Sequence, residues 1–368
     1  MSGDIPEKKK SKRLVSIDAL RGFDMFWIIG GGDIIEQFIK AVWNPLPQAV
    51  ARQFEHAEWI GFTAWDMIMP LFLFIVGASM PFSMSGYLKE TGGRKLFYRR
   101  LAKRFIILFI LGIAIQGNLF KFDPAQLHLY CNTLQAIACG YVVAAVVILN
   151  LRLVWQIAAC VALLAGYWAL MMLVPVPGYG AGVLEPSANL ALYIDELILG
   201  RFRDGTPYTW ILSSMTFSAT VLMGVMSGYI IKSGNKPAAR FWMLAGAGLG
   251  CLAAGYISGI WFPIIKHIWS SSFALCAGGW CFLLLAAFYG IIDIAGLKKW
   301  SFFFVVIGSN ALFVYSFTEF MGSYITKGIV IVMETMHPAV VAGVALSAFG
   351  ALWLLLYIMY RKEIFIRV

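Results

Sequence analysis

Charged residues are scarce in this sequence. Asp, Glu, Lys and Arg together make up 13% of its 368 residues, whereas soluble domains carry about 25%. Hydrophobic residues account for 60%, and the mean hydropathy is +0.78. This composition excludes an ordinary soluble domain and predicts an all-α, polytopic membrane helix bundle.

Several motifs and repeats are also missing. No GxGxxG, Walker or GxSxG pattern occurs, so the nucleotide-binding and hydrolase motifs of soluble enzymes are excluded. The six cysteines show no CxxC or Cys/His metal spacing, and we expect neither a disulfide framework nor a metal site. No internal repeat is visible, which counts against an inverted-repeat transporter.

Ten apolar segments are long enough to cross a bilayer, which takes about 20 residues. With the N-terminus inside, the cytosolic loops hold 21 of the 29 Lys and Arg, and the opposite loops hold seven. Cytosolic loops are enriched in these residues, so the bias predicts ten spans with both termini cytoplasmic and no nucleic-acid partner. The ten segments are 14–32, 60–84, 104–121, 131–150, 153–174, 209–231, 241–261, 269–291, 301–319 and 339–360.

The chain is expected to form one transmembrane domain over 14–361, between cytoplasmic tails at 1–13 and 362–368. The first apolar segment lacks an A-x-A-like cleavage site, so we expect it to be a retained helix and not a signal peptide.

Two further segments do not fit the pattern of spans. The outward loop 175–208 is rich in Pro and Gly, and it resembles a rim or lid with a short amphipathic stretch at Leu190–Leu199. Lys327–Met336 is too short to span and is expected to be re-entrant or interfacial.

The first two spans contain ionisable side chains that a lipid-facing helix would not carry. Asp18, Arg21 and Asp24 lie in the first span, Asp66 lies in the second, and His56 comes just before it. Such groups are costly in a bilayer and usually face a protein-lined cavity. We therefore predict the functional site here.

His56 is the strongest candidate for chemistry. It lies on the predicted outward side, between Glu55 and Glu58 and close to Trp59. An imidazole in this place suits a general base or an acyl acceptor. The alternative is an interfacial histidine beside a belt of tryptophans.

Asp66 follows His56 by ten residues. On an ideal helix it would lie about 15 Å further along and roughly 80° around, so a His56–Asp66 hydrogen bond is not expected. We predict that Asp66 pairs across the bundle instead, with Arg21, Lys266 or Asn310. Such a pair either takes part in a reaction or holds helices together.

Asp18 and Arg21 are spaced i,i+3 near the cytosolic end of the first span and can pair with each other. Arg21, with the basic cluster at 94–104, is also a candidate site for the phosphates of coenzyme A, although such a cluster is commonly a topology signal alone. Lys266 opens the eighth span and Asn310 lies inside the ninth, where polar residues often form helix–helix hydrogen bonds.

Two motifs in this region are specific. R-x-x-S-I-D-x-x-R-G runs from Arg13 to Gly22, and F-x-H-A-x-W-x-G-x-T-x-x-D-x-x-x-P-x-F-x-F-x-x-G-x-S runs from Phe54 to Ser79. They resemble the heparan-α-glucosaminide N-acetyltransferase family and its bacterial relatives. The similarity covers nearly the whole chain, continuing at Leu134–Tyr141, Asn189–Gly200, Ala219–Tyr229, Phe262–Phe273 and Gly308–Ser316.

The resemblance implies acetyl transfer across the bilayer. Acetyl-CoA would bind from the cytosol, and an amino sugar or related glycan would accept the acetyl group on the far side. It also implies an active-site histidine at His56. The predicted site residues are His56, Asp66 and Asn310 for catalysis, Lys266, Trp269, Trp59 and Glu58 for the acceptor, and Arg21 and Asp18 for acetyl-CoA.

The sequence departs from the family pattern mainly on the acceptor side. Ile265 replaces the asparagine of a P-x-N-K motif, Thr206–Thr209 reads T-P-Y-T in place of D-P-E-G, and Ala136 replaces the arginine of L-Q-R.

Two functions are therefore weighed. The first is an acetyl-CoA-dependent acyltransferase of a bacterial inner membrane, in which His56 activates the acceptor or carries the acetyl group, Asp66 orients the site and Asn310 stabilises the oxyanion. The second is an amino-sugar carrier with the same cavity, for which Gly30–Gly32 would supply a broken helix. A structural subunit is disfavoured by the buried charges, and a homodimer is among the arrangements left open.

Overall fold

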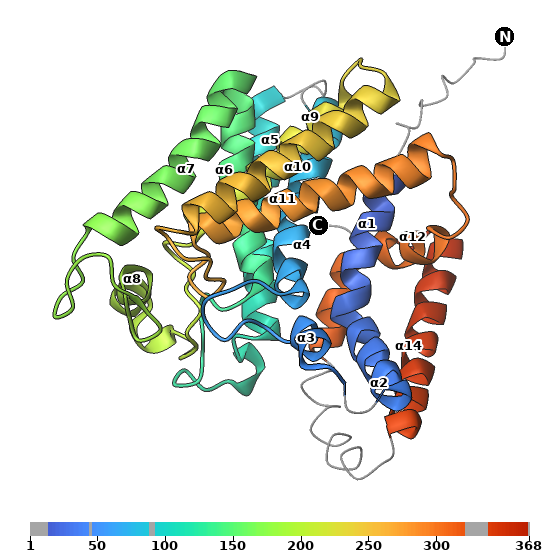
Figure 1. The fold of residues 1–368 in the computed structure, drawn as a ribbon, viewed down its shortest axis with the longest axis horizontal. Coiled ribbons are helices and arrows are strands. Elements are labelled where there is room, and N and C mark those ends of the chain that lie inside the picture. The colour runs from blue at the N-terminus through green and yellow to red at the C-terminus, as the bar shows by residue number, and fades with distance from the viewer. Residues whose placement is uncertain (1–13, 44–45, 88–92, 321–337, 367–368) are drawn as a thin grey trace.

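The computed structural model describes residues 14–43, 46–87, 93–320 and 338–366. These parts of the chain are almost entirely helical (Figure 1). The longer helices are α1 (Val15–Phe26), α2 (Gly32–Val42), α4 (Ile68–Tyr87), α5 (Gly93–Ile115), α6 (Thr133–Asn150), α7 (Leu153–Leu173), α8 (Leu190–Leu199), α9 (Ser214–Lys232), α10 (Pro237–Ser258), α11 (Ser271–Tyr289), α12 (Phe302–Ser309), Ala311–Phe320 and α14 (Pro338–Arg361).

Short elements join these helices. Among the described residues one two-stranded antiparallel hairpin occurs, formed by β1 (Leu184–Glu185) and β2 (Ala188–Asn189). Single helical turns occur at α3 (Gln48–Ala51), Arg52–Phe54, Ala64–Met67, Leu119–Lys121 and Gly200–Phe202, and π-helical turns at Trp27–Gly31 and Gly290–Ile294.

Polar residues set the starts of several helices. The side chains of Asn132, Asn189 and Ser270 accept hydrogen bonds from backbone N–H groups in the first turns of α6, α8 and α11. Pro237 stands in the first turn of α10, where its missing N–H is not needed. The stretch Leu190–Leu199, predicted to be amphipathic, forms helix α8, in which Asp195 is buried and Leu197 and Ile198 are exposed.

Seven described helices are long and apolar enough to cross a membrane, and an eighth span results if Phe302–Ser309 and Ala311–Phe320 count together. The predicted multi-pass helical bundle is thus supported, but the count of ten is not confirmed. In α5 the basic residues of the 94–104 cluster lie within the helix. The segment Lys327–Met336 lies outside the described residues.

The first predicted span is a broken helix. The regular helix ends at Phe26, and the backbone leaves helical geometry at Ile29 and at Gly30, whose φ is +103°. Helix then resumes as α2. Glycine adopts this positive φ without the steric cost that a side chain brings. The helix break that the carrier alternative would place at Gly30–Gly32 is present, at Ile29 and Gly30.

Glycines let pairs of helices approach closely. A Cβ placed on Gly224 of α9 would lie 2.0 Å from the carbonyl oxygen of Phe74 in α4. A Cβ on Gly248 of α10 would lie 2.9 Å from the oxygen of Gly279 in α11. Small residues at helix crossings are typical of membrane bundles, where packing replaces the hydrophobic effect as the force between helices.

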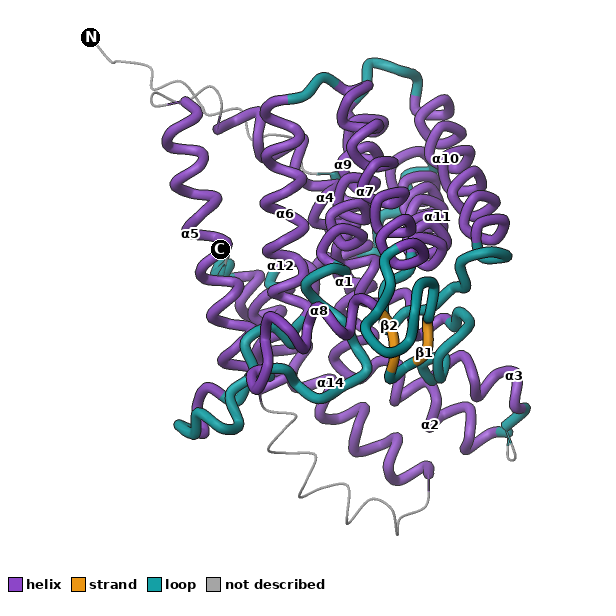
Figure 2. The backbone as a smooth tube through the Cα atoms, turned by 90° about the vertical axis from the view of Figure 1, so that its left-hand side faces the viewer, coloured by secondary structure: helices purple, strands orange, loops and turns teal. Residues whose placement is uncertain are grey.

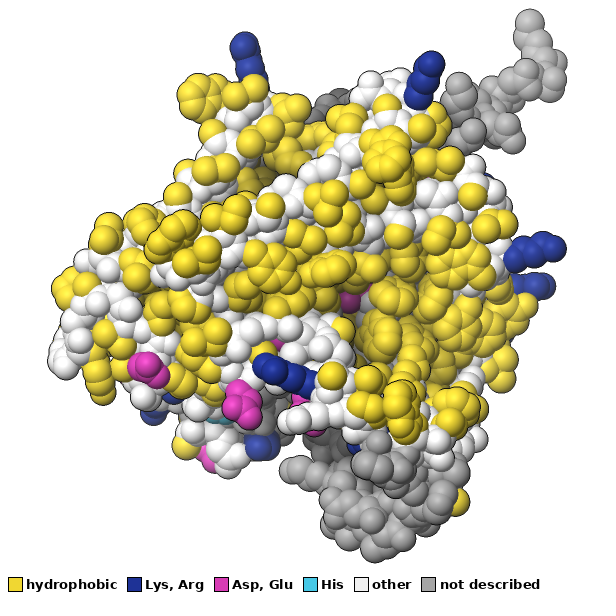
Figure 3. Space-filling model, viewed as in Figure 1, with side chains coloured by type: hydrophobic (Ala, Val, Ile, Leu, Met, Phe, Trp, Pro, Cys, Tyr) yellow, Lys and Arg dark blue, Asp and Glu magenta, His cyan; other side chains and the backbone are white. Residues whose placement is uncertain are grey.

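The outer surface of the bundle also has the character expected of a membrane protein. On the face formed by α7, α10 and α11, hydrophobic side chains cover the middle, and charged side chains stand mostly along its upper and lower rims (Figure 3). α10 and α14 expose most of their apolar side chains, whereas α9 is largely buried. An apolar band of this kind suits contact with lipid.

The irregular segments gather at one end of the bundle. Figures 1 and 2 both place α2, α3 and α8 in the lower half of the molecule, and Figure 2 shows the β1–β2 hairpin there as well. His56 belongs to the loop between α3 and α4, and we refer to this end as the His56 end. Loops at the end of a bundle are not surrounded by lipid, so they can carry polar side chains.

A valine at Gly224 is expected to destabilise the bundle by about 3 kcal/mol, because its side chain would force α9 away from α4. The measurement is the thermal unfolding temperature in detergent. Gly250→Val is the matched control, since a Cβ at Gly250 meets nothing within 4 Å. Equal unfolding temperatures for the two variants would contradict the close contact.

Candidate active site

The segment from Phe262 to Ser270, between α10 and α11, organises the His56 end. On one side, the oxygen of Ile264 accepts a hydrogen bond of 2.9 Å from Gly61 N–H in the His56 loop. On the other side, the oxygen of His267 accepts one of 3.0 Å from Thr209 N–H, just before α9. The segment thus joins two loops that are distant in sequence.

The same segment is fixed from within. Ser270 Oγ accepts from Ile265 N–H at 3.0 Å and donates to the oxygen of Pro263 at 2.8 Å. Trp269 adopts a left-handed backbone conformation with φ +49°, which is uncommon for a residue with a side chain. Internal hydrogen bonds of this kind hold the turn in one shape and so give Lys266 a defined position.

Asp66 is the buried centre of the site. Its side chain has no exposed surface. Oδ2 accepts hydrogen bonds from Thr63 N–H at 3.0 Å and from Thr63 Oγ1 at 3.1 Å, and Ala57 N–H lies 3.4 Å away. These contacts cap the turn Ala64–Met67 that leads into α4. The other carboxylate oxygen, Oδ1, takes no part in this cap and can contact side chains outside it.

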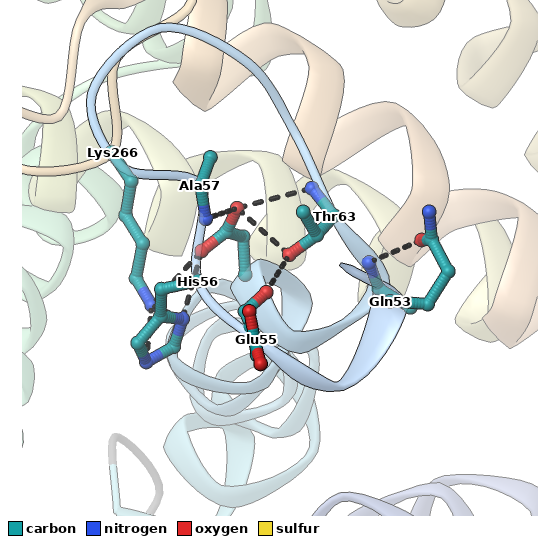
Figure 4. A network of polar contacts seen from close by, with 8 residues as sticks. Gln53, Glu55, His56, Ala57, Thr63 and Lys266 are labelled. Carbon is teal, nitrogen blue, oxygen red and sulfur yellow. Dashed lines mark hydrogen bonds and ion pairs between the residues drawn. The ribbon is translucent and has the colours of Figure 1, made fainter. Parts of the chain in front are cut away.

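Two side chains meet Oδ1. His56 Nδ1 lies 2.9 Å from it and Lys266 Nζ lies 3.3 Å from it. Lys266 Nζ is also 2.8 Å from Nδ1 and 3.2 Å from Nε2 of His56. Figure 4 shows the lysine and the imidazole converging beneath the loop that carries His56.

The prediction that His56 and Asp66 do not bond is wrong. It assumed one continuous helix through both residues, whereas the chain from Glu55 to Thr63 is a loop that folds back over the start of α4. The loop places Nδ1 against Oδ1 in spite of the ten-residue separation. The predicted pairing of Asp66 with Lys266 is confirmed.

Which atom donates along these contacts depends on the charge of Lys266, whose Nζ lies 2.8 Å from Nδ1. When the amine is neutral, Nδ1–H of His56 donates to the carboxylate of Asp66, a tautomer that leaves Nε2 with a lone pair. The His56 side chain is 41% exposed, and the Asp66 side chain behind it is fully covered. A carboxylate that orients an accessible imidazole is the arrangement that general bases and nucleophilic histidines use.

Lys266 is a buried amine, with its side chain 6% exposed. Burial lowers the pKa of Lys266 to about 8, although the Asp66 carboxylate acts in the opposite direction. Near neutral pH the amine therefore exchanges readily between its charged and neutral forms.

His56 and Lys266 line a cavity of about 650 Å³, and the buried Asp66 lies behind them. Its wall combines aromatic rings, among them Trp65 and Tyr208, with acidic groups such as Asp33. This volume is in the range of small-molecule sites.

Aromatic rings gather next to Lys266. The ring of His267 is stacked on Trp59, with centroids 5.1 Å apart, and its centroid lies 4.5 Å from that of Tyr208. Burial, followed by the nearby Lys266 cation, lowers the pKa of His267 to about 4, so its ring is neutral. Trp59 Nε1–H also donates to the oxygen of Leu184 in the β1–β2 hairpin at 2.8 Å. The loop 175–208 is thereby tied to the site.

The other predicted site residues are distributed differently. Glu58 is exposed in the His56 loop. Trp269 is buried and its Nε1 lies 3.4 Å from Thr220 Oγ1, so it packs in the core and does not line the cavity. Asn310 binds backbone groups of Ile364 and Ile366 after α14. The structure does not bring Trp269 or Asn310 to His56.

Asp18 and Arg21 form the expected pair, at 3.0 Å. Arg21 also donates to Ser79 Oγ in α4 at 2.8 Å. Ser79 follows Asp66 by thirteen residues, which is roughly 20 Å along a helix. The Arg21 pair and the His56 cluster therefore lie at different depths of the bundle.

Several cavity residues had no assigned role in the sequence analysis. Asp33, His128, Tyr208 and Tyr315 come from four separate segments of the chain. Only the packing of those segments places them around one space. Tyr208 and Tyr315 lie within T-P-Y-T and Gly308–Ser316, whereas no motif contains Asp33 or His128.

Among the described residues, no group of three or more His, Cys, Asp or Glu is arranged to hold a metal ion.

Comparison with known proteins identifies relatives. No family model matches the chain. Heparan-alpha-glucosaminide N-acetyltransferase of Homo sapiens is 25% identical over 422 aligned residues, covering 97% of this chain. The Mus musculus protein of the same name is 23% identical over 432 residues, covering 99% of this chain. The chain spans 60% and 62% of the length of these two relatives.

The fold and the site define a multi-pass helical membrane protein with a histidine–aspartate–lysine cluster beside a cavity. The similarity, which extends over almost the whole chain, relates it to the heparan-alpha-glucosaminide N-acetyltransferase family.

Lys266 is expected to titrate near pH 8, about two units below an ordinary lysine. Trace labelling with an amine reagent as a function of pH measures this. Asp66→Asn removes the carboxylate that raises the pKa of Lys266, so the titration should move to still lower pH. Glu58→Gln, at an exposed position, is the control and should leave it unchanged; a wild-type midpoint near 10.4 would contradict the geometry.

Proposed function

We propose that the protein is an integral membrane acyltransferase. It moves an acetyl group from cytosolic acetyl-CoA to an amino sugar or related glycan on the opposite face of a bacterial inner membrane. The observation that carries the proposal is the His56–Asp66 hydrogen bond of 2.9 Å, with His56 open to the cavity and Asp66 buried. The relatives, named N-acetyltransferases, support the reaction class.

His56 acts on the acceptor. With Nδ1–H held by Asp66, Nε2 takes a proton from the acceptor nitrogen as that nitrogen attacks the acetyl carbonyl. The same lone pair is also suited to holding the acetyl group as an acyl-imidazole before transfer. In both routes Asp66 stabilises the positive charge that develops on the ring.

Lys266 compensates the charge of Asp66 and also contacts the ring of His56. In its ammonium form, Lys266 lies 3.3 Å from Oδ1 and compensates the charge of the buried carboxylate. Removal of the lysine would leave an uncompensated buried charge, which is strongly destabilising.

The cavity provides space for the acceptor. Tyr208 and Trp65 offer ring faces on which an apolar face of a sugar stacks, and Asp33 offers an acceptor for hydroxyl or ammonium protons. The acceptor class remains part of the proposal, since Ile265 and Thr206–Thr209 differ from the family pattern at this end.

The donor is proposed to enter from the end where the charge bias places the cytosol, with both termini on that side. Arg21 is held by Asp18 and Ser79 and is partly exposed, at 24% of its side chain. It is proposed to meet the phosphates of coenzyme A, with Asp18 positioning the guanidinium. The oxyanion role of Asn310 remains a prediction beside its observed contacts with Ile364 and Ile366.

A carrier is the second candidate. Two observations favour it: the break at Gly30 and the 72° bend between Phe302–Ser309 and Ala311–Phe320. Broken helices commonly form transporter sites. A carrier has no need for an oriented imidazole, so the His56–Asp66 pair favours the transferase.

His56→Ala is expected to lower acetyl transfer by at least about 100-fold, because the group that moves the proton is lost. The purified protein in nanodiscs receives acetyl-CoA and a panel of amino sugars and glucosamine-terminated oligosaccharides, and free CoA is followed. Glu55→Gln, an exposed neighbour, is the control. CoA release by His56→Ala at the wild-type rate would exclude the mechanism, and amino-sugar counterflow in liposomes would then favour the carrier.

Asp66→Asn is expected to reduce kcat by about 100-fold or more, with a smaller change in KM. An amide presents an N–H group or a neutral oxygen to His56, so the Nδ1–H tautomer is no longer enforced and the ring charge is not balanced. Steady-state kinetics of CoA release measures the effect. A full kcat in a variant that unfolds at the wild-type temperature would show that Asp66 is structural only.

A further inference from the structure

The cavity contains an amine of the protein's own. Among the described residues that line it, Lys266 is the one lysine. Its Nζ lies 2.8 Å and 3.2 Å from the two ring nitrogens of His56, the residue at which acetyl transfer is proposed to occur. An external acceptor would have to bring its nitrogen to this same neighbourhood.

The distances suit a reaction as well as a hydrogen bond. Reacting atoms in near-attack geometries are about 3–3.5 Å apart. An acetyl group that reaches His56 Nε2, or the space beside it, therefore lies within reach of Nζ. The lysine side chain is packed at 6% exposure, so its amine is held in place.

The lysine also has a lone pair available. Burial lowers the pKa of Lys266 to about 8, and the titratable groups that face it are Asp66, His56 and its neighbour His267. A large fraction of the amine is thus neutral at mildly alkaline pH, whereas an ordinary lysine is almost fully protonated there.

We propose that Lys266 is a self-acetylation site: when acetyl-CoA is bound without an acceptor, Nζ takes the acetyl group and the enzyme is inactivated. The inference rests on the proposed acetyl transfer. The C–S bond of the thioester breaks and a C–N bond to Nζ forms. The proton released by the amine passes through His56 to the departing thiolate, so the products are Nε-acetyl-lysine and CoA.

Inactivation follows from the contacts of Nζ. Acetylation removes the positive charge that lies 3.3 Å from Asp66 Oδ1 and places an acetamide against His56. The buried carboxylate loses its compensating cation and the cavity loses room beside Nε2. A bound acceptor prevents this by occupying the same space and consuming the acetyl group first.

The test uses the wild-type protein in nanodiscs with deuterated acetyl-CoA and no acceptor. Peptide mass spectrometry over time is expected to show one label per chain at Lys266, stable to hydroxylamine as an amide is. Lys232 is the internal control, because its Nζ donates to the oxygen of Pro81 far from the cavity. Lys266 should be labelled at least about tenfold faster than Lys232, with activity lost in proportion.

Variants and added acceptors test whether the labelling of Lys266 depends on the site. His56→Ala should reduce labelling of Lys266 about tenfold, an acceptor that supports CoA release should suppress it, and Lys266→Arg should show no label at this position. Unfolding temperatures exclude misfolding as the cause.

Different results would overturn the self-acetylation of Lys266 and the proposed transferase activity. CoA release with an acceptor but no label on Lys266 would overturn the self-acetylation and leave the transferase intact. Labelling of Lys266 no faster than Lys232, or unchanged in heat-denatured protein, would overturn it as non-specific chemistry. Absence of both CoA release and label would reject both.

Discussion

Asp66 is a carboxylate without exposed surface, and the structure of the His56 end follows from the need to compensate it. Leaving such a charge unpaired would cost several kcal/mol. Thr63 and the His56 loop supply donors to one oxygen, and His56 and Lys266 supply donors to the other. Two of the groups that compensate the charge, His56 and Lys266, also line the cavity, so contacts that stabilise this end of the bundle also form the site.

The Phe262–Ser270 segment makes this compensation possible. It brings Lys266 from a point 200 residues after Asp66 and fixes it by hydrogen bonds to the His56 loop and to the residues before α9. Phe262 and Ile268 of the segment also pack into a small buried apolar cluster with Tyr167 of α7. The lysine can be held at 3 Å from an imidazole because its backbone is held from three sides.

The rest of the bundle has a simpler organisation. Glycine contacts bring α4 against α9 and α10 against α11, and the apolar faces of α10 and α14 remain for lipid. Non-helical backbone lies where other protein groups can hydrogen-bond to its N–H and C=O groups, because a bilayer offers these groups no partners. The breaks at Gly30 and before Ala311 are the exceptions within apolar segments. Both adjoin segments that border the cavity, which links helix irregularity to the site.

The sequence alone determined the class of fold and the importance of the Arg13–Met84 region. Long apolar runs have no stable alternative to helices in a membrane, so helix positions such as 339–360 and the amphipathic stretch at Leu190–Leu199 were predicted closely. His56, Asp66 and Lys266 were identified as candidates because charged groups are expensive beside lipid.

The tertiary structure decided which of these residues meet. Helix periodicity predicted that His56 and Asp66 lie apart. The folded loop between Glu55 and Thr63 brings them into contact. Asn310 was expected at the site but contacts the segment after α14. Asp33 and His128 line the cavity although no motif in the sequence contains them. Periodicity describes regular segments, whereas this site is built where regular structure stops and distant loops are joined by hydrogen bonds.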